Sequence, residues 1–299
     1  MRSTNLLLAC VSVILAACAA QAPSQAVDPS APLLVLSDTM AAGFGWPESV
    51  GCDASRNVLY VSQFGGEKLN ATAKDGKGYV SKVAPDGKIL EQRAFDVTMN
   101  KPKGIWIEGT RLWVTDIDSI WIFDTVSRQY KHLTIPGITF ANDVTVWNGG
   151  AYVSDNRADE LYRIEPADFL RGAAPRITKV WEKKGIFPNG LWPGKDGRLI
   201  MVGYESPEKH KGIWAMDREG RLEELSKPIG RLDGLYQRPD GTLLATDWDS
   251  GSVFRYGPHG HVQVLGKEFK GPADLCVMGD TVYVPDLVKG EMRIIKLDR

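Results

Sequence analysis

The sequence predicts an all-β protein, a six-bladed β-propeller of four-stranded antiparallel blades. Two observations carry this prediction: a short motif recurs six times, and each repeat reads as short strands separated by turns. The motif is a Pro or small residue, one variable position, often Gly or Asp, and then an apolar run. Repeats of about 40 to 50 residues built from short strands are typical of propellers. The six copies begin Pro47-Glu48, Pro102-Lys103, Ala141-Asn142, Pro188-Asn189, Leu232-Asp233 and Pro272-Ala273.

The fifth repeat shows how each blade is expected to be built. Residues 234–238, 243–246, 253–256 and 262–265 are its predicted strands, and Pro239-Asp240-Gly241 is a predicted tight turn. No amphipathic helix is predicted between any of the strands. Each repeat is therefore a meander of four neighbouring strands.

The ring is predicted to close through the N-terminal strand. The last repeat ends at its third strand, residues 292–297, whereas residues 33–37 form an extra strand before the first motif. If that strand becomes the outermost one of the sixth blade, it completes the blade and covers an open edge. We therefore predict one propeller domain over residues 33–299.

Two cysteines, Cys52 and Cys276, lie in the first and sixth motif strands, which become neighbours when the ring closes. A disulfide between them is one interpretation if the protein reaches an oxidising compartment. A pair of buried free thiols is the other.

Residues 1–17 have the pattern of a bacterial lipoprotein signal peptide. Arg2 precedes an apolar run, and Leu15-Ala16-Ala17-Cys18 is similar to a lipobox. Lipidation of Cys18 would leave residues 18–32 as a flexible tether rich in Ala, Gln, Ser and Pro. An ordinary secretory signal is the alternative. We predict an exported lipoprotein of the cell envelope, at the outer membrane if the cell is Gram-negative.

Composition and charge exclude several classes of partner. The 36 basic and 37 acidic residues are evenly spread and give a net charge of −1, so no basic field favours nucleic acid. No second hydrophobic segment approaches membrane length, which leaves the lipid as the only expected membrane attachment. We expect a monomer that acts on a small molecule.

Four motif strands carry an oxygen ligand at their second position, namely Glu48, Asn142, Asn189 and Asp233. If the motif strands line a central channel, these equivalent positions form a ring. Two carboxylates and two amide oxygens suit a hard cation, and Ca²⁺ is the expected cofactor. Such a cation could polarise a carbonyl group while Asp233 attacks it or deprotonates a water.

The same quartet carries a family resemblance. Glu48 in W-P-E-S, Asn142 in A-N-D-V, Asn189 in P-N-G-L and Asp233 in L-D-G-L resemble, in this order, the senescence-marker-protein/gluconolactonase family, which is regucalcin-like, and more distantly paraoxonase. The resemblance spans the chain after the signal segment. It implies a six-bladed propeller, a divalent cation held by these four residues, and hydrolysis of lactones or related esters with Asp233 as catalytic base or nucleophile.

Further candidates are expected on the face of the disc where the motif strands begin. Lys103 occupies the ring position of the second repeat, where it could hold an anionic substrate or pair with Asp274. Tyr204, His210 and Trp248 lie on loops of the same face and are candidate pocket residues.

The loops of this face carry two further predictions. Residues 63–78 form the longest loop and are a predicted lid or rim wall. An acidic residue also recurs just after the second strand of four repeats, and we expect it to tie down its own turn rather than bind a metal. These acids are Asp116, Asp155, Asp247 and Asp286.

Three functions remain open at this point. The first is a metal-dependent hydrolase of lactones or esters, and the second is a non-catalytic propeller that binds a ligand or a protein. The third is an enzyme similar to the strictosidine-synthase branch, which would not need the quartet. The complete quartet favours the first over the third.

Overall fold

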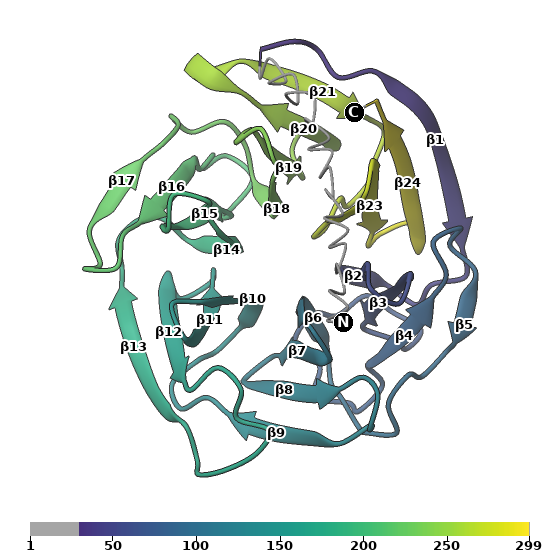
Figure 1. Cartoon of the computed structure of the whole chain (residues 1–299), viewed down its shortest axis with the longest axis vertical. Coiled ribbons are helices and arrows are strands. Elements are labelled where there is room, and N and C mark those ends of the chain that lie inside the picture. Colours follow the sequence, from purple (N-terminus) through teal and green to yellow (C-terminus); the bar gives the residue numbers. More distant parts are fainter. Residues whose placement is uncertain (1–29, 299) are drawn as a thin grey trace, which may run out of the picture.

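The computed structural model describes residues 30–298 and shows a six-bladed β-propeller of four-stranded antiparallel sheets around a central channel (Figure 1). The predicted signal peptide, Cys18 and residues 18–29 of the predicted tether lie outside the described residues. Among residues 30–298, no helix is long and apolar enough to cross a membrane. The predicted fold class is confirmed.

In blades 1 to 5, the four strands are arranged in chain order from the innermost strand to the outermost. Blade 1 has β2 (Pro47–Asp53), β3 (Val58–Gln63), β4 (Tyr79–Val83) and β5 (Ile89–Glu91). Blade 2 has β6 (Pro102–Glu108), β7 (Arg111–Asp116), β8 (Ser119–Asp124) and β9 (Tyr130–Thr134). Blade 3 has β10 (Ala141–Trp147), β11 (Gly150–Asp155), β12 (Glu160–Glu165) and β13 (Arg176–Glu182).

The other three blades repeat the arrangement. Blade 4 has β14 (Pro188–Pro193), β15 (Leu199–Gly203), β16 (Ile213–Met216) and β17 (Leu222–Glu224). Blade 5 has β18 (Leu232–Gln237), β19 (Leu243–Asp247), β20 (Ser252–Tyr256) and β21 (Val262–Gly266), with one 3₁₀ turn, Pro258–Gly260. Blade 6 has β22 (Cys276–Met278), β23 (Thr281–Asp286) and β24 (Glu291–Leu297), and β1 (Val35–Ala42) is its outer strand.

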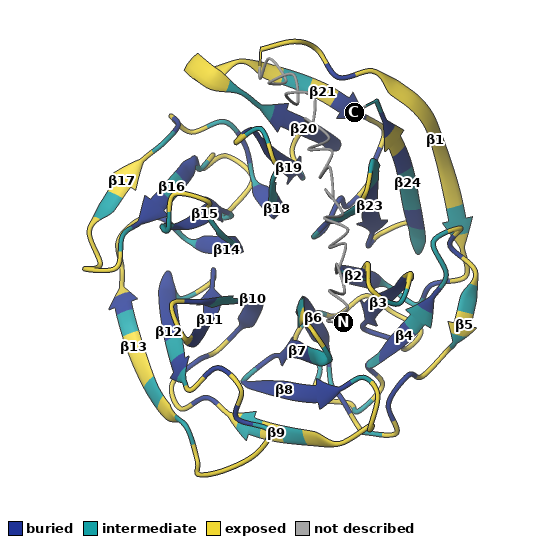
Figure 2. Cartoon of the chain, viewed as in Figure 1, coloured by how far each residue is buried: buried dark blue, intermediate teal, exposed yellow. Residues whose placement is uncertain are grey.

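The hydrophobic core lies between neighbouring blades rather than within one sheet. Inner strands are buried on both faces and outer strands are largely exposed (Figure 2). Between blades 1 and 2, for example, the Phe95 ring stacks on Tyr60 at 6.0 Å and on Phe123 at 4.0 Å between centroids. The blades are therefore held in place by apolar contacts with their neighbours, which fixes the position of every inner strand.

The ring closes as predicted, with a shift in the strand boundaries. β1 pairs antiparallel with β24 from Val35–Leu297 to Ala42–Glu291, so the closing strand begins two residues after the predicted start and runs five residues beyond its predicted end. The disulfide interpretation is confirmed: Cys52 of β2 and Cys276 of β22 are bonded, with their Cα atoms 5.8 Å apart. Strand and disulfide together join the first and last blades.

Candidate functional site

The quartet lies at the second position of β2, β10, β14 and β18, the innermost strands of blades 1, 3, 4 and 5 (Figure 1). All four residues are buried, with exposed fractions of 7% for Glu48, 6% for Asn142, 2% for Asn189 and 7% for Asp233. Lys103 on β6 and Ala273 just before β22 occupy the two remaining equivalent positions. Two acids, two amides, one ammonium group and one methyl group therefore stand at these six positions.

Hydroxyl groups on the second strand of several blades hold the ring positions. Ser154 accepts the Asp143 N–H at 3.0 Å and donates to the Asn189 carbonyl oxygen at 2.8 Å in the next blade. Thr246 accepts the Gly234 N–H at 2.7 Å and donates to the Ala273 carbonyl oxygen at 2.7 Å. Our sequence reasoning missed these hydroxyls. The sequence contained a signal that could have found them, because each of these Ser and Thr residues directly precedes one of the recurring acids.

The recurring acids themselves bind backbone, as predicted, but they reach beyond their own turns. Asp116 accepts the N–H groups of Asn100 and Lys101, each at 2.7 Å. Asp155 accepts the N–H groups of Thr139 and Phe140 in the same way. In blades 2, 3, 5 and 6 the acid thus fixes the residue two positions before the ring position, so it positions the ring indirectly.

Glycine follows the ring position where the inner strands approach one another most closely. A Cβ atom at Gly190 would lie 2.2 Å from the Asp233 carbonyl oxygen, and one at Gly104 would lie 2.4 Å from Asp143 Oδ1. No side chain fits at such distances. The motif glycines therefore allow the ring to be this narrow.

The pKa values of the two acids of the ring are raised. Burial and the nearby Asp274 raise the pKa of Asp233 to about 7, against the opposing effects of the hydrogen bond from Trp248 Nε1 at 2.7 Å and of the Asn189 side chain. Burial and the nearby Asp233 raise the pKa of Glu48 well above its usual range. Two buried carboxylates whose pKa values are raised by burial and by neighbouring acids are a site that a cation would stabilise.

The amide side chains of the ring, Asn142 and Asn189, are also suited to binding a cation. Asn189 Oδ1 is buried and has no hydrogen-bond partner among the described residues. Leaving such an oxygen unsatisfied costs about 1–3 kcal/mol. Asn142 donates its amide nitrogen to Asn156 Oδ1 at 3.1 Å, so the nitrogen is used within the protein and the oxygen is the group left for a ligand. The four side chains are the donor set that Ca²⁺ prefers.

No cluster of three or more Asp, Glu, His and Cys side chains within residues 30–298 is arranged to hold a metal ion. Cation binding at the ring would therefore depend on the two amides as well as on the two carboxylates.

Lys103 does not pair with Asp274. Its side chain is fully buried, and its ammonium group donates to the Lys101 carbonyl oxygen at 3.1 Å and lies 4.3 Å from the centroid of the Phe140 ring. No carboxylate in the described part of the chain lies within 4.0 Å of it. Burial lowers the pKa of Lys103 to about 8, against the opposing effect of Glu48.

Asp274 belongs to a second layer of the channel. It accepts the Leu275 N–H at 2.7 Å and the Ser49 hydroxyl at 2.6 Å, while Asp143 accepts the N–H groups of Val144 at 2.7 Å and Leu191 at 2.6 Å. These bonds join blade 6 to blade 1 and blade 3 to blade 4. Because both carboxylates are occupied in this way, we interpret them as structural.

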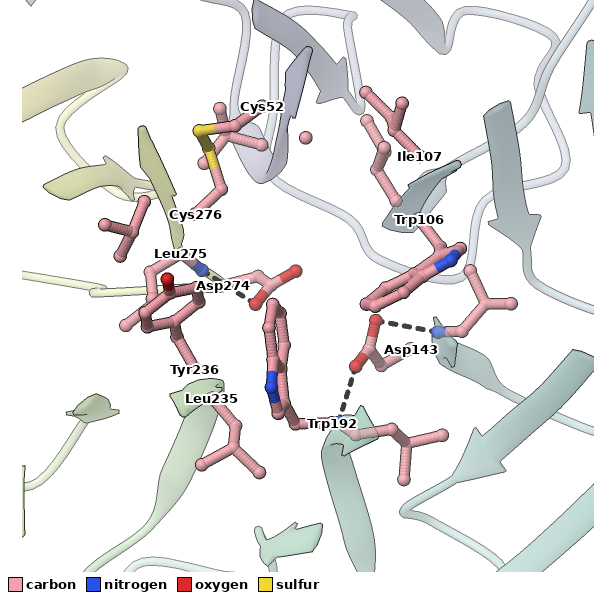
Figure 3. A pocket seen from close by; sticks show the side chains of 16 residues that line it. Cys52, Trp106, Ile107, Asp143, Trp192, Leu235, Tyr236, Asp274, Leu275 and Cys276 are labelled. Carbon is pink, nitrogen blue, oxygen red and sulfur yellow. Dashed lines mark hydrogen bonds between the residues drawn. A yellow bond between two sulfur atoms is a disulfide. The ribbon is translucent and has the colours of Figure 1, made fainter. Parts of the chain in front are cut away.

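A cavity of about 120 Å³ lies beyond this second layer (Figure 3). Trp192 packs edge-on against Trp106 at 5.4 Å and against Tyr236 at 4.7 Å, and the Cys52–Cys276 disulfide borders the same space. The aromatic groups narrow this end of the channel. Asp274, a predicted pocket residue, lies on this side and not beside Lys103.

The predicted walls Tyr204 and Trp248 lie beside the ring. Their rings meet edge to face at 5.9 Å, and Trp248 donates to Asp233. Trp46 and Trp248 also pack against a cluster of Phe64, Ala273 and Leu287, which forms an apolar wall on the side of blades 5, 6 and 1. Burial and the nearby Asp233 raise the pKa of Tyr204 to about 12, so it remains a neutral phenol.

His210 lies at the rim. Its Nε2 atom is 3.1 Å from Asp249 Oδ2, its side chain is half exposed, and Arg231 binds the other oxygen of Asp249 at 2.6 Å. The structure shows no contact between His210 and the ring residues, so His210 is not brought to the candidate site.

The loop between β3 and β4 contacts blade 2 along the rim, the position expected of a rim wall. Asp75 in this loop bonds the buried Lys101 at 2.9 Å, Lys74 bonds Asp118 at 2.5 Å, and the Gly76 N–H bonds Asn100 at 3.2 Å. All three partners belong to blade 2 or the segment leading into it.

Two further aromatic residues that the sequence suggests as pocket walls, Trp46 and Phe187, carry backbone strain next to the ring. Trp46 and Phe187 have φ values of 61° and 54°, and each directly precedes the motif proline of its repeat. Bulky residues rarely adopt this conformation, and such outliers gather at functional sites.

Comparison with known proteins supports the fold. No protein-family model matches the sequence, and no curated protein matches it either. A protein provisionally described as a gluconolactonase aligns with a TM-score of 0.65 at 14% identity, over 89% of this chain and 94% of the other. Virginiamycin B lyase from Staphylococcus aureus aligns with a TM-score of 0.58 at 14% identity, over 88% and 100%.

An auxiliary nutrient binding protein from Bacteroides ovatus aligns with a TM-score of 0.62 at 14% identity, over 86% of this chain and 70% of that protein. Enzymes and a binding protein thus share this architecture. Because the identities are so low, the likeness shows the fold alone, and function has to be argued from the site.

Proposed function

We propose that this propeller is a divalent-metal-dependent hydrolase of lactones or related esters. The observation that carries the proposal is the composition of the ring: two buried carboxylates next to a buried amide oxygen that has no partner among the described residues. We propose Ca²⁺ as the cofactor, with Glu48, Asn142, Asn189 and Asp233 as its ligands. The resemblance of the quartet to gluconolactonases supports the same reaction.

In this proposal Asp233 has the catalytic role, as general base toward a water or as nucleophile. Trp248 Nε1 binds its Oδ2 atom and so fixes the plane of the carboxylate. When bound, the cation would supply polarisation of the substrate carbonyl group. Glu48 has no such hydrogen-bonded orientation among the described contacts, and we assign it to charge balance at the ring.

The surroundings of the ring prepare the site for an apolar acyl or ring portion of a substrate. Trp46, Phe64 and Trp248 form an apolar wall beside Asp233, and Tyr204 closes it with a neutral ring. These groups restrict water to the region of the ring, where Asp233 can use it.

The test begins with the metal content of the purified protein and continues with lactones and aryl esters, each assayed with calcium and with a chelator. Asp233→Asn keeps an oxygen ligand and removes the basic carboxylate, so we expect metal to be retained while kcat falls about 10²-fold or more. Glu48→Gln removes one of the two charges, so we expect weaker metal binding. Full activity of a metal-loaded Asp233→Asn variant would refute the catalytic role.

A non-catalytic binding propeller is the second candidate. The protein would then hold the cation and bind a small molecule but turn over none of the esters or lactones. The same panel separates the two, because metal binding without any hydrolysis is the result that the binding function predicts.

A further inference from the structure

We propose that the ligand of this site carries an anionic group, which Arg157 binds on the side of blades 2 and 3, where the buried ammonium group of Lys103 adds to the positive potential. This inference rests on the proposed function in that it names the substrate class: an ester or lactone with a carboxylate, or another anion of similar charge, separate from the reacting carbonyl group.

Both cations contact the same aromatic side chain next to the ring. The Arg157 guanidinium carbon lies 3.8 Å from the centroid of Phe140, and Lys103 Nζ lies 4.3 Å from it. Phe140 directly precedes β10, two residues before Asn142. Stacking on an aromatic face holds the exposed Arg157 guanidinium group in place while its N–H groups remain available for a ligand, whereas Lys103 is fully buried.

Arg157 is held at this place by residues that also contact the ring. It follows Asn156, whose side chain bonds the Asn142 amide at 3.1 Å and the Tyr204 carbonyl oxygen at 3.4 Å. The Arg157 N–H donates to Asp155 at 3.1 Å. The exposed guanidinium group therefore stands at the entrance, a short distance along the chain from a candidate metal ligand.

Three other cations on this face have an acidic partner. Lys101 pairs with Asp75 at 2.9 Å, Arg231 with Asp249 at 2.6 Å and Lys211 with Glu205 at 2.7 Å. Neither the Lys103 ammonium group nor the Arg157 guanidinium group has a carboxylate within 4.0 Å in the described part of the chain. Burial lowers the pKa of Lys103, as does Arg157, whereas the more distant Glu48, Asp116 and Asp155 raise it.

A guanidinium group without an ion-paired carboxylate, next to a second positive charge, favours an anion beside it. Trp46, Ala273 and Trp248 form an apolar wall on the side of blades 5, 6 and 1. A substrate would therefore bind in one orientation, with its anionic group toward blades 2 and 3 and its apolar part toward blades 5, 6 and 1. Its carbonyl group would lie at the ring between them.

The test uses two esters with the same leaving group, 4-nitrophenyl benzoate and mono-4-nitrophenyl terephthalate, which differ by one carboxylate that cannot reach its own ester carbonyl group. We expect the wild-type protein to have a higher kcat/KM for the acidic ester. Arg157→Gln should reduce the ratio of acidic to neutral kcat/KM about tenfold, the effect of losing one charge-assisted contact. Higher salt should reduce the same ratio in the wild type.

The control is Arg93→Gln. Arg93 is also exposed and stacks on an aromatic ring, that of Tyr79 at 4.6 Å, but it follows the outer strand β5 of blade 1. Arg93→Gln should leave the ratio of acidic to neutral kcat/KM unchanged. A ratio that Arg157→Gln does not alter, or a wild-type preference for the neutral ester, would overturn the inference.

Calorimetric binding of succinate and of acetate to the calcium-loaded protein tests the inference without turnover. We expect succinate to bind more tightly than acetate and to lose about tenfold in affinity in Arg157→Gln. If succinate binding depends on Arg157 but no ester or lactone is hydrolysed, the anion site stands and the hydrolase proposal fails. If esters are hydrolysed but neither preference nor binding depends on Arg157, the anion site fails and the hydrolase proposal stands.

Discussion

Replacement of Asn189 by Leu tests the metal ring at the residue whose amide oxygen is buried without a partner in the described structure. Leu has a similar volume and no polar atom. In the presence of a chelator, the change removes an unsatisfied oxygen, a gain of about 1–3 kcal/mol, and loses the favourable interaction of the Asn189 amide with Asp233, a loss of similar size. We therefore expect the chelated variant to melt within a few degrees of the chelated wild type.

Calcium should raise the Tm of the wild type more than the Tm of Asn189→Leu. If Kd for the wild type is about 10 μM, calcium at about 1 mM adds about 2.7 kcal/mol of stability, which raises Tm by roughly 5–10 °C for a domain of this size. Changes in groups around a metal site alone weaken binding about 10–100-fold. Loss of a direct ligand should do at least as much, which reduces the calcium-induced rise in Tm to about 1–5 °C.

The assay is thermal unfolding of each protein with calcium and with a chelator. Asn70→Leu is the matched control, because it makes the same chemical change on the same face. Asn70 is exposed in the rim loop and bonds only its local neighbour Thr72 in the described contacts. A calcium-induced shift in Asn189→Leu equal to that of the wild type would refute the role of this amide as a ligand.

Three further predictions concern the frame of the site and the N-terminal segment. Replacing Cys52 and Cys276 with Ser removes a crosslink over a sequence separation of 224 residues, which costs about 5 kcal/mol in a chain-entropy estimate, and an unchanged Tm would contradict this role. Gly190→Ala should lower stability by about 1–3 kcal/mol, because the new Cβ meets the Asp233 carbonyl oxygen at 2.2 Å, and a variant as stable as the wild type would show that the strands can move apart. Mass spectrometry of the mature N-terminus should find a lipidated Cys18, and an unmodified end or cleavage elsewhere would end that proposal.

The sequence was sufficient for the architecture because the fold depends on a repeated local pattern. The spacing of the six motifs predicted the blade number, and the extra strand before Pro47 predicted the closure with β24 and placed Cys52 near Cys276. The boundaries were less certain. The pairing of β1 depends on which residues face blade 6, and no local signal sets this register.

The candidate site was predictable only where the repeat determines position. Equivalent motif positions brought the quartet to the channel, but the side-chain partners depended on contacts between blades that lie far apart in the sequence. Lys103 turns toward Phe140 and not toward Asp274, because Asp274 is already bound by Ser49. His210 is bound by Asp249 at the rim. The role of Arg157 became visible only with its contact to Phe140.

A crystal structure with calcium bound tests the central claim most directly, since the claim is that one ring of four side chains holds one divalent cation. We predict a single anomalous-difference peak about 2.3–2.6 Å from the side-chain oxygens of Glu48, Asn142, Asn189 and Asp233. A ring that contains only water in calcium-saturated crystals, or a peak that contacts Asp143 and Asp274 instead of these four, would contradict it.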